Sequence, residues 1–141
     1  MGTFLGLDFG QKRVGVAVSD ETKMIATPLK TLSFQGRRQL WSELESLIRE
    51  YQVETVVVGL PKTMNNEVGP AAEKVQEHVE WFSGQSETPW VFWDERLTTR
   101  EAESVLLEAD VSRAKRKEVI DQLAAQRILQ GYLDKKNYEK S

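Results

Sequence analysis

The sequence predicts a single α/β domain with a mixed five-stranded sheet and helices on both faces. Three observations lead to this prediction. Three short segments rich in β-forming residues come first, and the links between them are too short for a crossover, so these strands should be antiparallel. The spacing of apolar residues then changes to that of an amphipathic helix. Two further β-rich runs alternate with helices, which is typical of parallel strands with crossover connections.

The first three predicted strands cover Thr3 to Phe9, Arg13 to Ser19, and Ile25 to Thr31. Gly10 to Arg13 suits a hairpin turn between the first two strands. The third strand contains Pro28, which has no amide hydrogen to donate to a neighbouring strand. We therefore expect the third strand at an edge of the sheet.

A first helix follows, because apolar residues recur on one helical face. These residues are Leu40, Trp41, Leu44, Leu47, Ile48 and Tyr51. The next segment, residues 55–58, is β-branched throughout and ends at Gly59-Leu60-Pro61. A continuous run of this kind is typical of a strand buried on both faces in the centre of a sheet.

The second half of the chain should contain three more helices and one more strand. A helix is expected over Pro70 to Phe82 and a strand over Trp90 to Trp93. Thr98 and Glu101 form a capping box that would open the next helix. A last helix should run from about Arg113 to Leu133. The predicted domain covers residues 1–134, and residues 135–141 are expected to be a frayed tail.

The composition limits the chemistry that the chain can perform. There is no cysteine, which excludes disulfides, thiolate zinc sites and a cysteine nucleophile. His78 is the single histidine, so a site with several histidines is excluded. A bound metal would be held mainly by oxygen ligands, which favours Mg²⁺ or Mn²⁺. The longest apolar run is far too short to cross a membrane, and no signal peptide is recognisable, so we expect a cytoplasmic protein.

The distribution of charge matters more than its sum. The formal net charge is −3, which argues mildly against a nucleic-acid partner. Cations nevertheless gather at a few places where they could hold phosphates. These candidates are Lys12, Arg13, Lys62, Arg96, Arg113, Lys115, Arg116 and Lys117.

Carboxylates stand where a metal site could form. Asp8 lies near the end of an apolar strand, and Asp94-Glu95 follows the fifth strand. Asp121 lies beside the apolar face of the last helix. Taken singly, Asp8 could support the turn that follows it, Asp94-Glu95 could belong to a loop, and Asp121 could flank the solvent. Taken together, converging carboxylates repel one another unless a cation lies between them. Two Mg²⁺ ions about 4 Å apart could then promote hydrolysis of a phosphodiester.

Four segments resemble the YqgF/RuvX family and occur in the order of that family. They are GLDFGQKRVGVAVSD, VVGLPKTM, DERLTTREAE and IDQLAAQRILQGYL, and they begin at Gly6, Val57, Asp94 and Ile120. The resemblance implies an RNase H-like fold related to the resolvase RuvC. It also implies a metal-dependent nuclease, a hydrolase described either as a Holliday-junction resolvase or as an enzyme that matures the 5′ end of pre-16S ribosomal RNA.

The resemblance further implies that Asp8, Glu95 and Asp121 form the catalytic, metal-binding set. Glu95 is preferred because the family's DER motif is usually interpreted in that way, and Asp94 stays an alternative. RNA is favoured weakly over branched DNA, and the ribosome or its precursor particles would be the partner. Whether the protein is a monomer or a homodimer is left open.

Other interpretations are available for parts of the sequence. The segment from Asp8 to Arg13 also resembles the phosphate loop of sugar kinases and actin-type ATPases, but 141 residues are too few for the two lobes of those enzymes. His78 is expected to pack or to lie at the surface, not to act as a base. The four tryptophans are expected to pack in or beside the core. A nucleic-acid-binding or ribosome-associated factor without cleavage is the alternative from another functional class.

Overall fold

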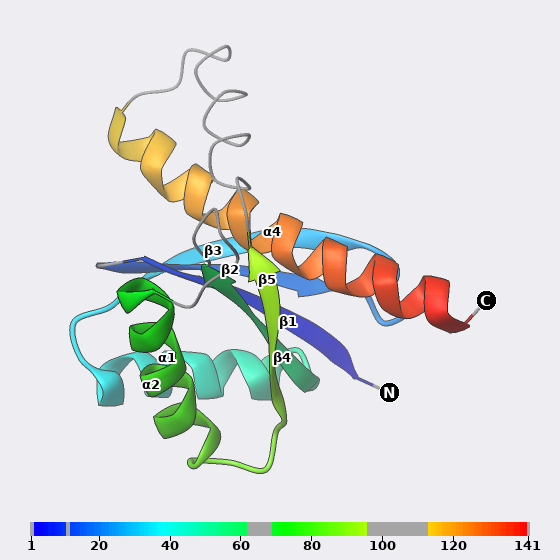
Figure 1. Cartoon of the computed structure of the whole chain (residues 1–141), viewed down its shortest axis with the longest axis horizontal. Coiled ribbons are helices and arrows are strands. Elements are labelled where there is room, and N and C mark those ends of the chain that lie inside the picture. Colours follow the sequence, from blue (N-terminus) through cyan, green and yellow to red (C-terminus); the bar gives the residue numbers. More distant parts are fainter. Residues whose placement is uncertain (1, 11, 62–68, 96–112, 141) are drawn as a thin grey trace.

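The computed structural model describes residues 2–10, 12–61, 69–95 and 113–140, and for Glu95 and residues 113–118, 139 and 140 it describes the backbone alone. One mixed sheet has the strand order β3-β2-β1-β4-β5 (Figure 1). The strands are β1 (Thr3–Phe9), β2 (Arg13–Ser19), β3 (Ala26–Ser33), β4 (Val53–Pro61) and β5 (Trp90–Glu95). The first three strands are antiparallel, and β4 is parallel to both β1 and β5. The predicted mixed five-stranded sheet is therefore confirmed.

Helices cover both faces of this sheet (Figure 1). Helices α1 (Arg37–Glu50) and α2 (Pro70–Ser83) pack on one face, and α4 (Arg113–Lys140) packs on the other. The larger core, with Leu5, Leu7 and Phe82 among its members, lies between the sheet and the first two helices. The smaller core lies under α4. Among the residues that the structure describes, no helix combines the length and apolarity needed to cross a membrane.

Several elements differ in extent from the prediction. β3 lies at the edge, as Pro28 indicated, but it runs to Ser33 and pairs with β2 through a register shift between Val16 and Ala17. α1 begins at Arg37, ahead of its first buried apolar residue, Leu40. The helix predicted to start at Thr98 lies outside the described residues.

The last helix is longer than predicted. It continues to Lys140, so the described part of the segment that was expected to be a frayed tail is helical. Asn137 donates a hydrogen bond from Nδ2 to the carbonyl oxygen of Lys23, at 3.1 Å. The ammonium of Lys136 lies 5.7 Å from the centroid of the Phe4 ring. These contacts attach the end of α4 to the sheet.

Glycines in the sheet allow α4 to approach it closely. A Cβ atom on Gly6 of β1 would lie 2.7 Å from Cβ of Leu129 and 3.0 Å from the carbonyl oxygen of Ala125. On the helix, a Cβ atom on Gly131 would lie 3.0 Å from Nε1 of Trp93. Side chains larger than hydrogen would push helix and sheet apart at these positions.

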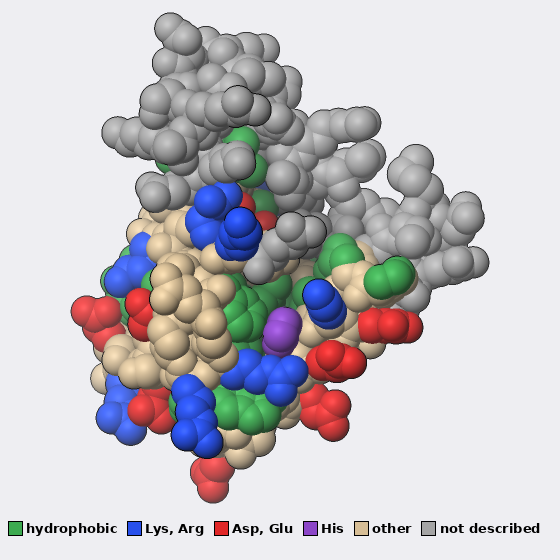
Figure 2. Space-filling model, turned by 90° about the vertical axis from the view of Figure 1, so that its left-hand side faces the viewer, with side chains coloured by type: hydrophobic (Ala, Val, Ile, Leu, Met, Phe, Trp, Pro, Cys, Tyr) green, Lys and Arg blue, Asp and Glu red, His purple; other side chains and the backbone are tan. Residues whose placement is uncertain are grey.

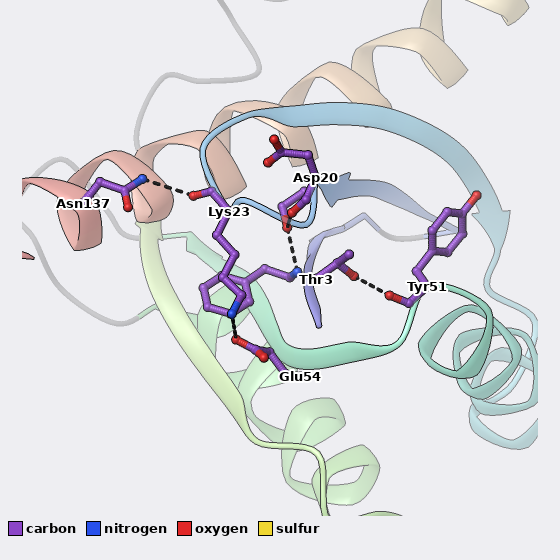
Figure 3. Close-up of polar contacts among 8 residues, drawn as sticks. Thr3, Asp20, Lys23, Tyr51, Glu54 and Asn137 are labelled. Atoms are coloured by element: carbon purple, nitrogen blue, oxygen red, sulfur yellow. Dashed lines mark hydrogen bonds and ion pairs between the residues drawn. The ribbon is translucent and has the colours of Figure 1, made fainter. Parts of the chain in front are cut away.

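Polar contacts join the elements at the amino-terminal end of β1 (Figure 3). Thr3 donates a hydrogen bond from Oγ1 to the carbonyl oxygen of Tyr51, at 2.8 Å. The Lys23 ammonium lies 2.6 Å from a carboxylate oxygen of Glu54. Strands from both sides of β1 and the end of α1 are thus tied together at this end of the sheet.

Ser19 supplies a buried hydrogen bond at the same end, and its removal should destabilise the fold. Its Oγ accepts a hydrogen bond from the amide of Phe4, at 2.8 Å, and donates one to the carbonyl oxygen of Asp20. In a Ser19→Ala variant the buried Phe4 amide would lose this partner, so the free energy of unfolding should fall by about 1 to 3 kcal/mol. Urea denaturation would measure the change.

The matched control is Ser46→Ala. Ser46 is exposed on α1, and its hydroxyl donates to the Ser42 carbonyl oxygen within the same helix. Alanine is the better helix former, so this variant should be as stable as the wild type or slightly more stable. If the Ser19→Ala and Ser46→Ala variants have the same urea midpoint, the hydrogen bond between the Phe4 amide and Ser19 does not stabilise the fold as described.

Candidate functional site

Three parallel strands end at the same edge of the sheet and bring Asp8, Asp94 and Glu95 to it. β1, β4 and β5 are mutually parallel, so their carboxyl ends lie together. Asp8 is the penultimate residue of β1, one position beyond the Leu7–Val58 pair. Asp94 and Glu95 end β5, where they pair with Leu60 and Pro61. In open sheets with parallel strands, binding sites form beyond such carboxyl ends.

Asp8 lies on the α4 side of the sheet. Side chains alternate between the two faces of a strand. Phe4 belongs to the core under α4, and Gly6 lies against Ala125 and Leu129 of that helix. Asp8 is the next residue of the same parity, and it is half-buried. The carboxylate is thus placed between the sheet and α4, at the edge where the strands end.

Gly15 brings Asp121 to the same place. Gly15 of β2 is the Cα partner of Asp8 in the β1–β2 ladder. A Cβ atom built on Gly15 would lie 1.9 Å from the backbone carbonyl oxygen of Asp121 and 2.3 Å from its carbonyl carbon. The backbone of α4 therefore rests directly on Gly15. As a result, two of the three predicted catalytic acids, Asp8 and Asp121, flank one glycine.

Arg13 forms an ion pair with Asp121. Its Nε atom donates to Oδ2 of Asp121 at 3.0 Å, and the two side chains are 40% and 20% exposed. Arg13 has the same parity in β2 as Gly15, so it lies on the α4 face as well. The sequence suggested a phosphate-binding role for Arg13. The structure places it as a partner that holds one carboxylate of the acidic site.

The geometry of β5 bears on the choice between Asp94 and Glu95. The Trp93 ring packs under α4, where its centroid lies 6.2 Å from that of Tyr132. Because successive side chains point to opposite faces, Asp94 lies on the face away from α4 and Asp8. The side chain of Glu95 lies outside the described residues. The preference for Glu95 over Asp94 stays a prediction.

The structure describes some of the predicted phosphate-binding cations. Lys12 is exposed in the β1–β2 turn, beside Arg13. Lys62 and Arg96 lie outside the described residues. The cluster of Arg113, Lys115, Arg116 and Lys117 forms the first turns of α4. Arg113 precedes Asp121 by about 12 Å of helix rise. The backbone therefore carries this cluster past the acidic site and beyond the sheet edge (Figure 1).

A divalent cation with oxygen ligands fits the donor atoms present here. Asp8 and Asp121 supply carboxylates, the sequence has no cysteine, and His78 lies on α2 across the sheet. Magnesium is commonly held by one or two carboxylates together with substrate phosphates. Within the described residues, no group of three or more acidic or histidine side chains could hold a metal by itself. Two carboxylates and a phosphate-bearing substrate would meet the requirement.

Gly15 lies at the candidate site, although the sequence patterns considered above do not point to it. A glycine inside a strand often marks a close approach of another backbone, and RVGVAVS contains one. That signal was available in the sequence. The identity of the approaching segment was not, because it depends on α4 crossing β2 more than one hundred residues later.

Comparison with known proteins gives consistent results over nearly the whole chain. The model of the family described as "RuvX: Holliday junction resolvase" matches residues 2–135. A Listeria monocytogenes serotype 4b protein named "Putative pre-16S rRNA nuclease" is 52% identical, over 94% of this chain and 98% of that protein. A relative of the same name from Clostridioides difficile is 51% identical, over 94% of both chains.

Two solved structures share the fold. The Thermus thermophilus RuvC in complex with a Holliday junction substrate aligns with a TM-score of 0.57 over 96% of both chains, at 13% identity. The fowlpox virus resolvase, in complex with Holliday junction DNA, aligns with a TM-score of 0.56 over 94% of this chain and 97% of that chain, at 12% identity. At such identities the likeness concerns the fold, and it confirms the predicted RNase H-like class.

Proposed function

Because the chain belongs to the RuvX family, we propose that this nuclease is metal-dependent and that it cuts the 5′ precursor segment of small-subunit ribosomal RNA. The prediction of a nuclease is confirmed by the family and by the names of its relatives. The metal dependence is supported by one observation above all. Asp8 and Asp121 flank Gly15 at the edge where the parallel strands end.

The proposed site uses Asp8 and Asp121 as ligands of Mg²⁺ or Mn²⁺, with Glu95 as the third acid. Bound divalent cations supply a water of lowered pKa and neutralise charge on the leaving oxygen of a phosphodiester. The two carboxylates position that chemistry against the sheet edge. Arg13 holds Asp121 through their ion pair, which fixes the carboxylate while the substrate binds. The start of α4, with its four cations, would hold the sugar–phosphate backbone beyond the site.

The choice of RNA rests on the relatives. Proteins about 50% identical to this chain, and matched over nearly their full length, are named for pre-16S rRNA. The description of the family favours a second candidate, the resolution of Holliday junctions. A resolvase would act as a dimer that makes two symmetric cuts. The net charge of −3 offers no large basic surface for a four-way junction, which favours the RNA.

The proposal places the protein in the cytoplasm, where ribosomal precursor particles would present the RNA. Purified protein should be tested with two labelled substrates side by side, the 5′ precursor RNA and a four-way DNA junction. Mg²⁺, Mn²⁺ and a chelator would be compared for each. Cleavage of the RNA that the chelator abolishes supports the proposal, whereas paired cuts in the junction alone would favour the resolvase. If the protein binds these substrates but cleaves neither, and if it also fails to cleave the RNA within precursor particles, it is a non-cleaving factor.

Arg13 should act as a positioning residue for Asp121. An Arg13→Ala variant would leave the Asp121 carboxylate without its guanidinium partner, and loss of such an orienting partner typically costs about 10- to 100-fold in metal affinity or activity. We expect the cleavage rate to fall and the concentration of Mn²⁺ needed for the half-maximal rate to rise. The affinity for RNA should change little. A single-turnover metal titration would separate these effects.

Lys12→Ala is the matched control, since Lys12 is an exposed cation in the same turn. If Arg13 served mainly as a phosphate ligand, both variants would weaken RNA binding alike, and the metal requirement would stay as in the wild type. That result would contradict the positioning role.

A further inference from the structure

A cavity lies across the sheet from the acidic site. Its volume is about 780 Å³, within the range of pockets that bind small organic ligands. Phe9, Phe34 and His78 contribute its aromatic surface. Lys12 and Lys74 contribute cations. Figure 2 shows the histidine beside an apolar surface with lysine and arginine side chains around it. Lys12 is the one described residue of this lining that was predicted as a phosphate-binding candidate, and the proposed chemistry at the carboxylates makes no use of the cavity.

The aromatic side chains form a continuous group. The Phe34 and His78 ring centroids are 4.9 Å apart and the planes are tilted by 60°. Phe9 is stacked on His78 with centroids 6.0 Å apart and planes within 19°. All three side chains are partly buried, so each keeps part of its surface toward the cavity. Aromatic rings of this kind provide stacking surfaces for unpaired bases, whatever the sequence of the strand.

Cations lie near His78 in this cavity. Burial lowers the pKa of His78, and the nearby charges of Arg37 and Lys74 lower it further, against an opposing effect of Glu77. His78 Nδ1 is buried and has no hydrogen-bond partner among the described residues.

Two helices also begin at the rim of the cavity. Gly36 and Pro70, at the starts of α1 and α2, line it, and neither helix has a side-chain cap. Helix amino termini carry partial positive charge. Rings, cations and helix starts thus converge in one hollow.

The β1–β2 turn connects this cavity to the acidic site. Gly10 donates its amide hydrogen to the carbonyl oxygen of Arg13 at 2.8 Å, which closes the turn. Lys12 of this turn lines the cavity, and Arg13 next to it pairs with Asp121 on the other face. A strand held at the acidic site could therefore pass over the turn and place a neighbouring nucleotide in the cavity.

We propose that this cavity binds one unpaired nucleotide of the substrate strand, with its base against Phe34 and His78 and its phosphate near Lys12 and Lys74. The inference rests on the proposed nuclease function, since it takes the same strand to be the substrate. A fully paired duplex could not offer an unstacked base to these rings. The cavity would therefore make the enzyme prefer single-stranded RNA near the cleaved bond.

The test uses oligonucleotides of the 5′ precursor RNA with 2-aminopurine placed at successive positions, bound to full-length Asp8→Asn protein so that cleavage does not interfere. Quenching at one position is expected on binding. Phe34→Ala should weaken binding by about 5- to 100-fold and remove the quenching. Lys74→Gln should weaken binding about 3-fold and reduce by about 1 the slope of log affinity against log salt. Lys74 is exposed, so its replacement leaves the fold intact even if Phe34→Ala does not.

Lys135→Gln is the matched control, because Lys135 is an exposed cation on α4, over Trp93. Unchanged affinity for both cavity variants, or an absence of quenching at every position, would overturn the inference. Adenosine monophosphate serves as the second arm. If adenosine monophosphate binds as tightly as the oligonucleotide and competes with it for the Phe34 and His78 rings, the cavity holds free nucleotides and not the substrate strand.

The same preparations with Asp8 intact separate this inference from the proposed function. A wild type that fails to cleave with Mg²⁺ or Mn²⁺ argues against the nuclease proposal, whatever the fluorescence shows. If the wild type cleaves the RNA, and if Phe34→Ala and Lys74→Gln cleave and bind it equally well, only the proposal of nucleotide binding in the cavity is contradicted.

Discussion

Replacing Asp8 with asparagine is expected to reduce cleavage by about 10³-fold or more while the protein still folds and binds RNA. A loss of this size corresponds to about 4 kcal/mol of transition-state stabilisation. Asparagine keeps the shape of the side chain but lacks the negative charge that a divalent cation requires. Removing one negative charge should, if anything, strengthen binding of a phosphate backbone. Single-turnover cleavage and fluorescence anisotropy, measured on the same labelled RNA, would report the two effects separately.

Asp94→Asn is the control for this experiment. Asp94 ends the neighbouring strand and is exposed, but strand alternation places it on the face away from α4. The cleavage rate of the Asp94→Asn variant should stay within a few-fold of that of the wild type. A larger loss for Asp94→Asn than for Asp8→Asn would exclude the assignment of the site to the α4 face.

Replacing Gly15 with alanine should have the largest effect on stability. The added methyl would lie 1.9 Å from the carbonyl oxygen of Asp121, 2.3 Å from its carbonyl carbon and 3.0 Å from its Cα atom. These are backbone atoms of a long helix, so no side-chain rotation can relieve the overlap. The helix is also held to the sheet at Gly6, by Ala125 and Leu129. We expect the free energy of unfolding to fall by about 3 kcal/mol.

The comparison variant is Gly84→Ala at the end of α2. The backbone of Gly84 is in the right-handed helical region at φ −76°, and a Cβ atom would make ordinary contacts at 3.5 and 3.7 Å. This variant should match the wild type or gain up to about 1 kcal/mol, since alanine restricts the unfolded chain. Urea midpoints that are the same for both variants would show that α4 does not rest on Gly15 as described.

Much of the fold could be predicted from local patterns in the sequence. Short links after the first two strands dictated antiparallel pairing, and the β-branched run over 55–58 indicated a central strand. Pro28 correctly indicated the edge. The ends of elements were harder to predict, because they depend on tertiary contacts. Asn137 and Lys136 extend α4 through contacts with the β2–β3 turn and β1, which no periodicity in the helix could reveal.

The candidate site could be predicted in part for a similar reason. A carboxylate in an apolar strand was a strong local signal for Asp8. The face of Asp94 could not be predicted, because alternation gives the period of a strand but not its phase. The packing of Trp93 under α4 sets that phase. The juxtaposition of Asp8 and Asp121 needed the Gly15 contact, and the cavity at Phe34 needed the meeting of three separate elements.

The most direct test of the two-carboxylate site is to locate the metal. Crystals soaked in Mn²⁺ would be measured at a wavelength where manganese scatters anomalously. We expect a peak at the carboxylates of Asp8 and Asp121, which would be lost in crystals of the Asp8→Asn protein. A manganese peak elsewhere, with none at these two carboxylates at saturating metal, would contradict the assignment of Asp8 and Asp121 as the metal ligands.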